Sequence, residues 1–129
     1  MRILGIDYGD KKIGTAFGDS GAGIAVPLDV VQNAGDATIR AFAKQVKDED
    51  IGLIVVGAPL SSQSTAQLEK VRAFTAKLAA AVSVPIAEED ESFTTAESRR
   101  LMAEGETAAE EDALAAMLIV QQYLNNHPA

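Results

Sequence analysis

The chain has no cysteine and only one histidine among its 129 residues. The lack of cysteine excludes a disulfide framework and any thiolate metal site, and it suits a reducing compartment. The single histidine, His127, lies close to the C-terminus, where we expect a frayed and solvated side chain. Any metal site must therefore be built mainly from oxygen ligands.

Basic and aromatic residues are also scarce. There are 11 Lys and Arg against 19 Asp and Glu, which gives a formal net charge of -8. This balance argues against tight, sequence-blind binding of nucleic acid, because such binding depends on neutralising phosphates with Lys and Arg. A metal-dependent nuclease remains compatible with it, since bound divalent ions contact phosphate themselves. Aromatic residues make up 5% of the chain, which gives little support to an extended stacking platform for single strands.

Long apolar runs and several common catalytic motifs are missing as well. The longest apolar stretch, Ala113 to Val120, is too short to cross a bilayer, and the N-terminus lacks the zones of a signal peptide. We therefore expect a cytoplasmic protein with no membrane partner. The chain has no Walker-type Gly-Lys-Ser/Thr loop, no Gly-x-Gly-x-x-Gly motif and no nucleophile elbow.

The sequence does contain an ordered series of strand and helix patterns, consistent with one globular domain over residues 1–129. Strands at about 2–8, 12–18 and 24–31 are expected to form an antiparallel meander, with Pro27 marking the third as an edge strand. Further strands are expected at 53–57 and from 84. Helices are expected at 36–48, from a Ser64 cap to Val82, from a Thr94 cap, and from a Thr107 cap to about Asn125. This order predicts an α/β fold, a mixed five-stranded sheet with helices on both faces.

Asp7 is the most informative acid, because it ends an otherwise apolar run from Ile3. Along a strand, Ile3, Gly5 and Asp7 share one face, and Gly5 leaves room there for a helix or ligand. Ligands in such sheets sit at the carboxyl ends of strands, which is where Asp7 lies. The alternative is a structural role, in which Asp7 starts the following turn.

Glu91 and Asp112 are the other two candidate acids. Glu91 ends the fifth expected strand, although it stands in a run of four acids in which Asp90 is a rival. Asp112 opens the most apolar helix, whose small residues would let it approach the sheet near Asp7. Each could instead serve as a helix-capping or dipole-pairing acid. Three carboxylates at one sheet edge would suit Mg²⁺ or Mn²⁺, and two such ions about 4 Å apart can promote phosphodiester hydrolysis.

Lys11 and Lys12 follow Asp7 in the first hairpin turn. They could contact a phosphate backbone and thus bind nucleic acid. The equally good alternative is that they are simply the exposed charges of a hairpin turn.

Several segments resemble the YqgF/RuvX-like family of small RNase H-fold proteins. The matching segments, in order, are 5–16, 25–28, 54–60, 90–95 and 112–124, so they span nearly the whole chain. The resemblance implies a metal-dependent nuclease that processes the 5′ end of precursor 16S ribosomal RNA, or a Holliday junction resolvase-like enzyme. The family's acidic residues fall on Asp7, Glu91 and Asp112, and its basic first-turn positions fall on Lys11 and Lys12.

The chain also departs from the family pattern. Ser61 to Ser64 replace an Asn and an acid-Gly pair, Ser92 replaces an Arg, and the loop at 104–107 is acidic where the family is often basic. These changes leave the carboxylates in place but remove positive charge from the expected substrate surface.

Three functions are therefore compatible with the sequence. The first is a nuclease acting on structured RNA, and the second is the same chemistry on branched DNA. Symmetric resolution of a junction generally needs a two-fold homodimer, to which Phe74 or the Tyr123 end of the last helix could contribute. The third is a catalytically degenerate domain that binds a partner through its acidic surface.

Overall fold

The computed structural model describes residues 1–60, 65–91 and 108–128 of the chain. The described part contains one five-stranded sheet with the strand order β3-β2-β1-β4-β5. The strands are β1 Arg2–Asp7, β2 Lys12–Asp19, β3 Ile24–Gln32, β4 Ile51–Ala58 and β5 Ile86–Asp90; the helices are α1 Asp36–Asp48, α2 Thr65–Ala81 and α4 Ala108–Asn126.

The sheet is mixed, as predicted. Strand β1 pairs antiparallel with β2 and parallel with β4, while β2 and β3 are antiparallel and β4 and β5 are parallel. This order makes β1 the central strand and places β3 at an edge, where Pro27 costs no interior ladder hydrogen bond. The expected edge position of Pro27 is thus confirmed.

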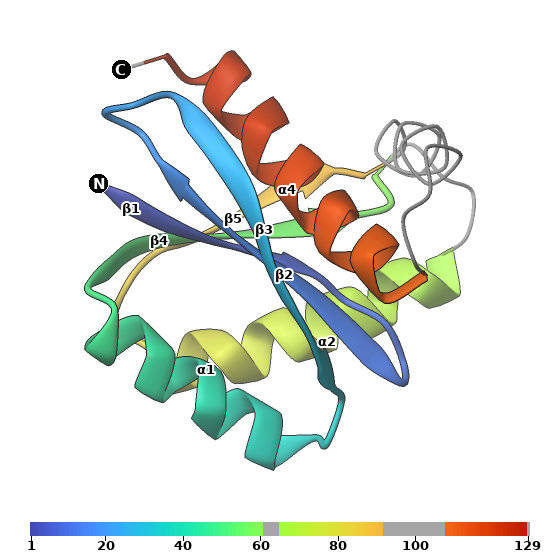
Figure 1. The fold of residues 1–129 in the computed structure, drawn as a ribbon. Helices are drawn as coiled ribbons and strands as arrows, with labels where there is room; N and C mark the ends of the chain where they lie inside the picture. Colours follow the sequence, from blue (N-terminus) through green and yellow to red (C-terminus); the bar gives the residue numbers. More distant parts are fainter. Residues whose placement is uncertain (61–64, 92–107, 129) are drawn as a thin grey trace.

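Helices cover both faces of the sheet, which confirms the predicted layers (Figure 1). Alternation along β1 sends Leu4 and Ile6 into a core shared with α1 and α2. Ile3 points to the opposite face, into a second core with α4. All three side chains are fully buried.

Glycines on three strands allow α4 to lie close to the sheet. A Cβ atom added at Gly5 or Gly18 would overlap with the Val120 side chain, and one at Gly57 would overlap with Ile119. The room predicted at Gly5 is therefore filled by a helix. Because the strands carry no side chain at these positions, α4 lies close to the sheet and its residues come within reach of groups on β1.

One strand starts later than predicted, and three predicted features of helices fall outside the described residues. Strand β5 begins at Ile86 rather than at 84, because Pro85 has no N–H and contributes only a carbonyl, which accepts a hydrogen bond of 3.0 Å from the Ile54 N–H. The helix expected from Thr94 and the caps at Ser64 and Thr107 lie outside the described residues.

The structure contradicts a role for Phe74 at a dimer surface, and it confirms only part of the expectation for His127. Phe74 cannot form a dimer surface, because it is only 7% exposed and packs against the ring of Tyr8, with 4.8 Å between ring centroids. His127 is exposed but not frayed. Its ring stacks on Tyr123 with 4.2 Å between centroids, and one ring nitrogen lies 3.0 Å from the Tyr123 carbonyl oxygen.

Candidate active site

Asp7 is the last residue of the central strand, at the edge where β1, β4 and β5 have their carboxyl ends. In the β1–β2 register it lies opposite Gly14. Such an edge is the usual position of ligand sites in sheets that contain parallel strands.

Glu91 reaches Asp7 although β4 lies between their strands. The N–H of Glu91 donates a hydrogen bond of 3.1 Å to the carbonyl of Ala58, which holds the chain after β5 against the end of β4. Gly57 has no side chain, so Ile119 of α4 and the Glu91 carboxylate both come close to β4 at this point; an added Cβ there would overlap with Ile119 and lie 3.2 Å from Glu91 Oε2. Beside this glycine the carboxyl group of Asp7 makes a hydrogen bond with the Glu91 carboxylate.

Asp112 comes to the same place from α4. Its carbonyl oxygen occupies the space that a side chain at position 14 would need, so the helix backbone lies directly over Gly14. Because Gly14 is the cross-strand partner of Asp7, this contact brings Asp112 close enough to act on Asp7 electrostatically. The structure thus brings the three predicted acids to one edge of the sheet.

The pKa of Asp7 is raised well above its ordinary value. Desolvation is the largest cause, followed by the charge of Glu91, the hydrogen bond with Glu91 and the charge of Asp112. The residue keeps some exposure to solvent, but its carboxyl group is surrounded by enough protein for desolvation to dominate.

Burial also raises the pKa of Glu91, and the charge of Asp90 adds to this, whereas the hydrogen bond with Asp7 lowers it. The same hydrogen bond therefore acts in opposite directions on the two acids. Burial and the neighbouring acids therefore favour the protonated form of Asp7 more than they would for an ordinary Asp.

The donor chemistry of this cluster fits a hard divalent cation. Carboxylate oxygens are the ligands that Mg²⁺ and Mn²⁺ prefer, and a cation would relieve the repulsion that helps to raise the pKa of Asp7. As they stand, the described His, Cys, Asp and Glu side chains include no group of three that could hold a metal ion. Coordination by all three acids therefore requires their carboxyl groups to turn from the arrangement in which Asp7 and Glu91 bond to each other.

Lys11 lies in the turn between β1 and β2 and Lys12 is the first residue of β2; both are exposed. Asn33 holds this turn: its backbone N–H donates to the Lys11 carbonyl at 2.8 Å, and its side-chain amide donates to the Gly9 carbonyl at 3.0 Å. Ser92 and the acidic segment 104–107, whose effect on the substrate surface was in question, lie outside the described residues.

Sequence analysis missed two residues that shape this region. Besides Asn33, Gln122 of α4 donates hydrogen bonds to Glu89 Oε2 at 3.2 Å and to the Asp90 carbonyl at 3.0 Å. It thereby ties the helix that carries Asp112 to the strand that leads to Glu91, and it satisfies the buried Glu89. A polar side chain in the apolar helix pattern was the only signal of this role.

The sequence matches a known protein family over nearly its whole length. The model of the family described as "RuvX: Holliday junction resolvase" matches residues 1–126. A relative from Pelotomaculum thermopropionicum, named "Putative pre-16S rRNA nuclease", is 36% identical over 98% of this chain and 88% of its own length. Relatives of the same name from Thermoanaerobacter pseudethanolicus and an Anaeromyxobacter species are also 36% identical, over 98% and 100% of this chain and 97% and 100% of their own.

Solved structures with the same fold include two resolvases bound to junctions. RuvC of T. thermophilus in complex with a Holliday junction substrate superposes with a TM-score of 0.63 at 18% identity, covering 98% of this chain and 96% of that one. The Fowlpox virus resolvase in complex with Holliday junction DNA gives a TM-score of 0.65 at 10% identity, covering 98% of each chain. At these identities the likeness establishes the fold, and it confirms the predicted RNase H-like class.

Proposed function

The chain belongs to the RuvX family, and on this premise we propose that it is a metal-dependent nuclease that hydrolyses phosphodiester bonds in structured RNA. More specifically, we propose that it processes the 5′ end of precursor 16S ribosomal RNA in the cytoplasm. This assignment is supported by the names of the relatives that match nearly the whole chain.

The observation that carries this proposal is the hydrogen-bonded pair Asp7 and Glu91 with Asp112 beside it. Crowding acids at a partly buried sheet edge costs stability, because desolvation and mutual repulsion both disfavour the ionised forms. A purely structural role would favour a single acid with a basic partner. Three acids drawn together fit a site whose occupant is a cation.

Asp7, Glu91 and Asp112 would hold one or two Mg²⁺ or Mn²⁺ ions. When bound, such ions lower the pKa of a coordinated water and stabilise charge on the phosphoryl oxygens. The chain itself supplies the arrangement: β1 fixes Asp7 at the centre, Gly57 lets Glu91 approach, and Gly14 lets the start of α4 bring in Asp112. Lys11, in the turn that follows Asp7, and Lys12, at the start of β2, would contact substrate phosphates.

A cleavage assay on a precursor RNA with an extended 5′ end tests this function. Wild-type protein with Mn²⁺ or Mg²⁺ is expected to cut the RNA, and EDTA is expected to stop the reaction. The Asp7→Asn variant is expected to be inactive, while Glu69→Gln, a change on the exposed side of α2, should remain active. Cleavage that persists in pure Asp7→Asn protein would refute the assignment.

Cleavage of branched DNA is the second candidate, favoured by the family description and by the two resolvases of the same fold. Symmetric cutting of a four-way junction would require a homodimer with two active sites. Junction DNA and precursor RNA should therefore be compared under identical conditions, together with the molecular mass in solution. Faster cleavage of the junction by a dimeric protein would favour this candidate over RNA.

A further inference from the structure

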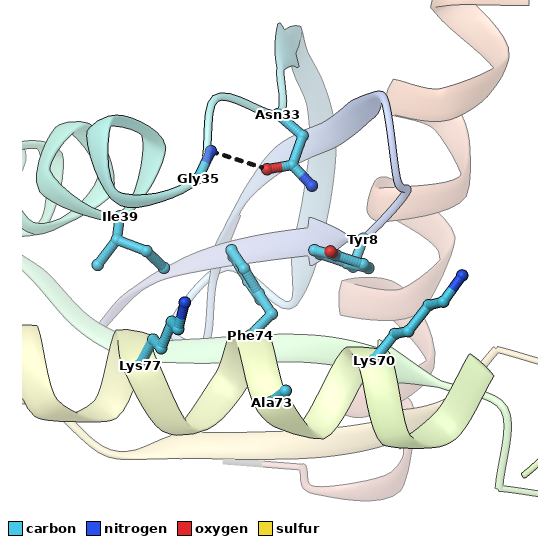
Figure 2. A pocket seen from close by; sticks show the side chains of 8 residues that line it. All are labelled: Tyr8, Asn33, Gly35, Ile39, Lys70, Ala73, Phe74 and Lys77. Carbon is cyan, nitrogen blue, oxygen red and sulfur yellow. Dashed lines mark hydrogen bonds between the residues drawn. The ribbon is translucent and has the colours of Figure 1, made fainter. Parts of the chain in front are cut away.

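A pocket lies at the same edge of the sheet as Asp7 but on the opposite face. It has a volume of about 220 Å³ and is bordered by Tyr8, by Ile39 of α1 and by Phe74 of α2 (Figure 2). Tyr8 follows Asp7 directly, and its side chain packs into the core on the α1 and α2 side. The pocket and the acid cluster are thus joined by two consecutive residues of one strand end.

Two lysines stand at the pocket on α2. Lys70 and Lys77 are separated by two helical turns, so they lie on the same side of the helix, with Phe74 between them (Figure 2). In a chain of net charge -8, two cations at one small pocket are a local departure from the overall charge.

The partners of these lysines do not block the pocket. Lys70 pairs with Asp10 at 3.2 Å and Lys77 with Asp36 at 3.9 Å, and the lysine side chains are 53% and 67% exposed. Ion pairs this exposed contribute little and exchange readily for a stronger partner. Asp10 also belongs to the turn that contains Lys11 and leads into Lys12 of β2, so its ion pair with Lys70 links these cations to the pocket.

The combination of an aromatic ring and flanking cations suits one nucleotide. Bases stack on aromatic side chains regardless of sequence, and lysines take the phosphates on either side. The volume is below the range of about 300–1,000 Å³ typical of small-molecule sites, which suits one base better than a whole free ligand. A single tyrosine also makes no extended platform, in keeping with the low aromatic content.

We propose that this pocket binds one unpaired nucleotide of the substrate strand, with its base against Tyr8 and its phosphates at Lys70 and Lys77. The inference rests on the proposed nuclease function and deepens it, because it makes the enzyme prefer RNA with an unpaired segment beside the scissile bond. The strand would then cross the carboxyl edge of β1, with its scissile phosphate on the Asp7 side.

Filling the pocket tests the proposal without touching the acid cluster. Ala73 borders the pocket, so Ala73→Phe should occupy the space of the base. Ala79→Phe, at an exposed position on the same helix away from the pocket, is the matched control. Affinity is measured by fluorescence anisotropy in EDTA, with a labelled RNA hairpin that carries a single-stranded overhang and with its blunt counterpart.

Wild-type protein and Ala79→Phe should bind the overhang hairpin about tenfold more tightly than the blunt one, a typical effect of stacking one base. Ala73→Phe should abolish this preference while leaving the affinity for the blunt hairpin unchanged. Absence of the preference in wild-type protein, or its survival in folded Ala73→Phe, would overturn the proposal.

A charge variant keeps the proposal testable if Ala73→Phe does not fold. Lys70→Gln with Lys77→Gln should weaken overhang binding, whereas Lys44→Gln with Lys47→Gln, on exposed positions of α1, should not. Equal losses in the two double variants would contradict a role for the pocket.

Because binding is measured without metal, the outcome does not depend on cleavage. A protein that cuts RNA but shows no pocket-dependent preference would keep its proposed function and lose this inference. A protein that shows the preference but cuts nothing would lose the function and retain the binding site.

Discussion

Asp7 and Glu91 share a hydrogen bond across strand β4, at the position of Gly57. Asp7 belongs to the central strand and Glu91 follows the edge strand, so neither acid could reach the other over a larger residue. The glycine is therefore as much a part of the site as the acids are. This relationship makes the site sensitive to substitutions that remove no ligand.

Gly57→Ala should weaken both the fold and the site. The new Cβ would overlap with the end of Ile119 and would lie 3.2 Å from Glu91 Oε2. We expect a loss of about 1–3 kcal/mol in the free energy of unfolding, as is typical of overpacking, together with weaker Mn²⁺ binding. Urea unfolding and calorimetry would measure the two effects.

Gly21→Ala is the matched control for this substitution, because an added Cβ there meets only Asp19 Oδ1, at an ordinary 3.5 Å. Gly21→Ala should change neither the free energy of unfolding nor the affinity for Mn²⁺ noticeably. A Gly57→Ala protein with wild-type stability and metal affinity would show that the space above β4 is not limiting.

Stability in metal-free buffer should fall as the pH rises through the range in which Asp7 titrates. The pKa of Asp7 is raised in the folded protein, whereas an Asp in the unfolded chain has a pKa of about 3.9. Between these values the folded state binds more protons than the unfolded state, so an increase in pH lowers the free energy of unfolding. The loss is complete once the pH exceeds the folded pKa.

The Asp7→Asn variant should lack this pH dependence, because the amide cannot ionise but can still donate a hydrogen bond to Glu91. In EDTA at neutral pH the variant should be at least as stable as wild type. Urea unfolding at a series of pH values would measure this stability and the pH profile. Glu69→Gln should follow the wild-type profile. A wild-type profile in Asp7→Asn would mean that another group causes the pH dependence.

Divalent metal should raise the thermal stability of the wild-type protein, since a ligand that binds only the folded state stabilises it. At a metal concentration about 100 times the Kd, the expected gain is about 2.7 kcal/mol. Differential scanning calorimetry with Mn²⁺ would measure it. Asp7→Asn and Asp112→Asn should gain much less, and an equal gain in these variants would place the metal at another site.

Lys11 and Lys12 should affect RNA binding but not folding. Both side chains belong to exposed residues, so Lys11→Gln with Lys12→Gln should change the free energy of unfolding by less than about 0.5 kcal/mol. If each lysine contacts a phosphate, each substitution should reduce the slope of log affinity against log salt by about 0.7–0.9. An unchanged slope would support the alternative, in which they are ordinary exposed charges of a hairpin turn.

The sheet and its layers could be predicted from the sequence because they follow from local patterns. The apolar runs, the turn residues and Pro27 each carry their information within a few residues. The position of Asp7 at a strand end, and the room beside Gly5, could be inferred in the same way.

The close contacts at Gly14 and Gly57 that bring the three acids together could not be predicted so directly. Gly14 and Gly57 matter because α4 and Glu91 pass over them, and which segment passes over a glycine depends on tertiary packing. The same limit applies to Gln122, whose partners lie on β5. It applies also to Phe74, which the sequence offered as one of two possible contributors to a dimer surface and which packs against Tyr8 instead.

The central claim is that Asp7, Glu91 and Asp112 together bind a divalent cation. Anomalous scattering from a crystal soaked in Mn²⁺ tests it most directly, because it locates the ion independently of any activity. We predict an ion coordinated by oxygens of all three acids, with the Asp7–Glu91 hydrogen bond broken. A crystal with no ordered ion at this edge of the sheet, or an ion bound by only one of the acids, would contradict the account.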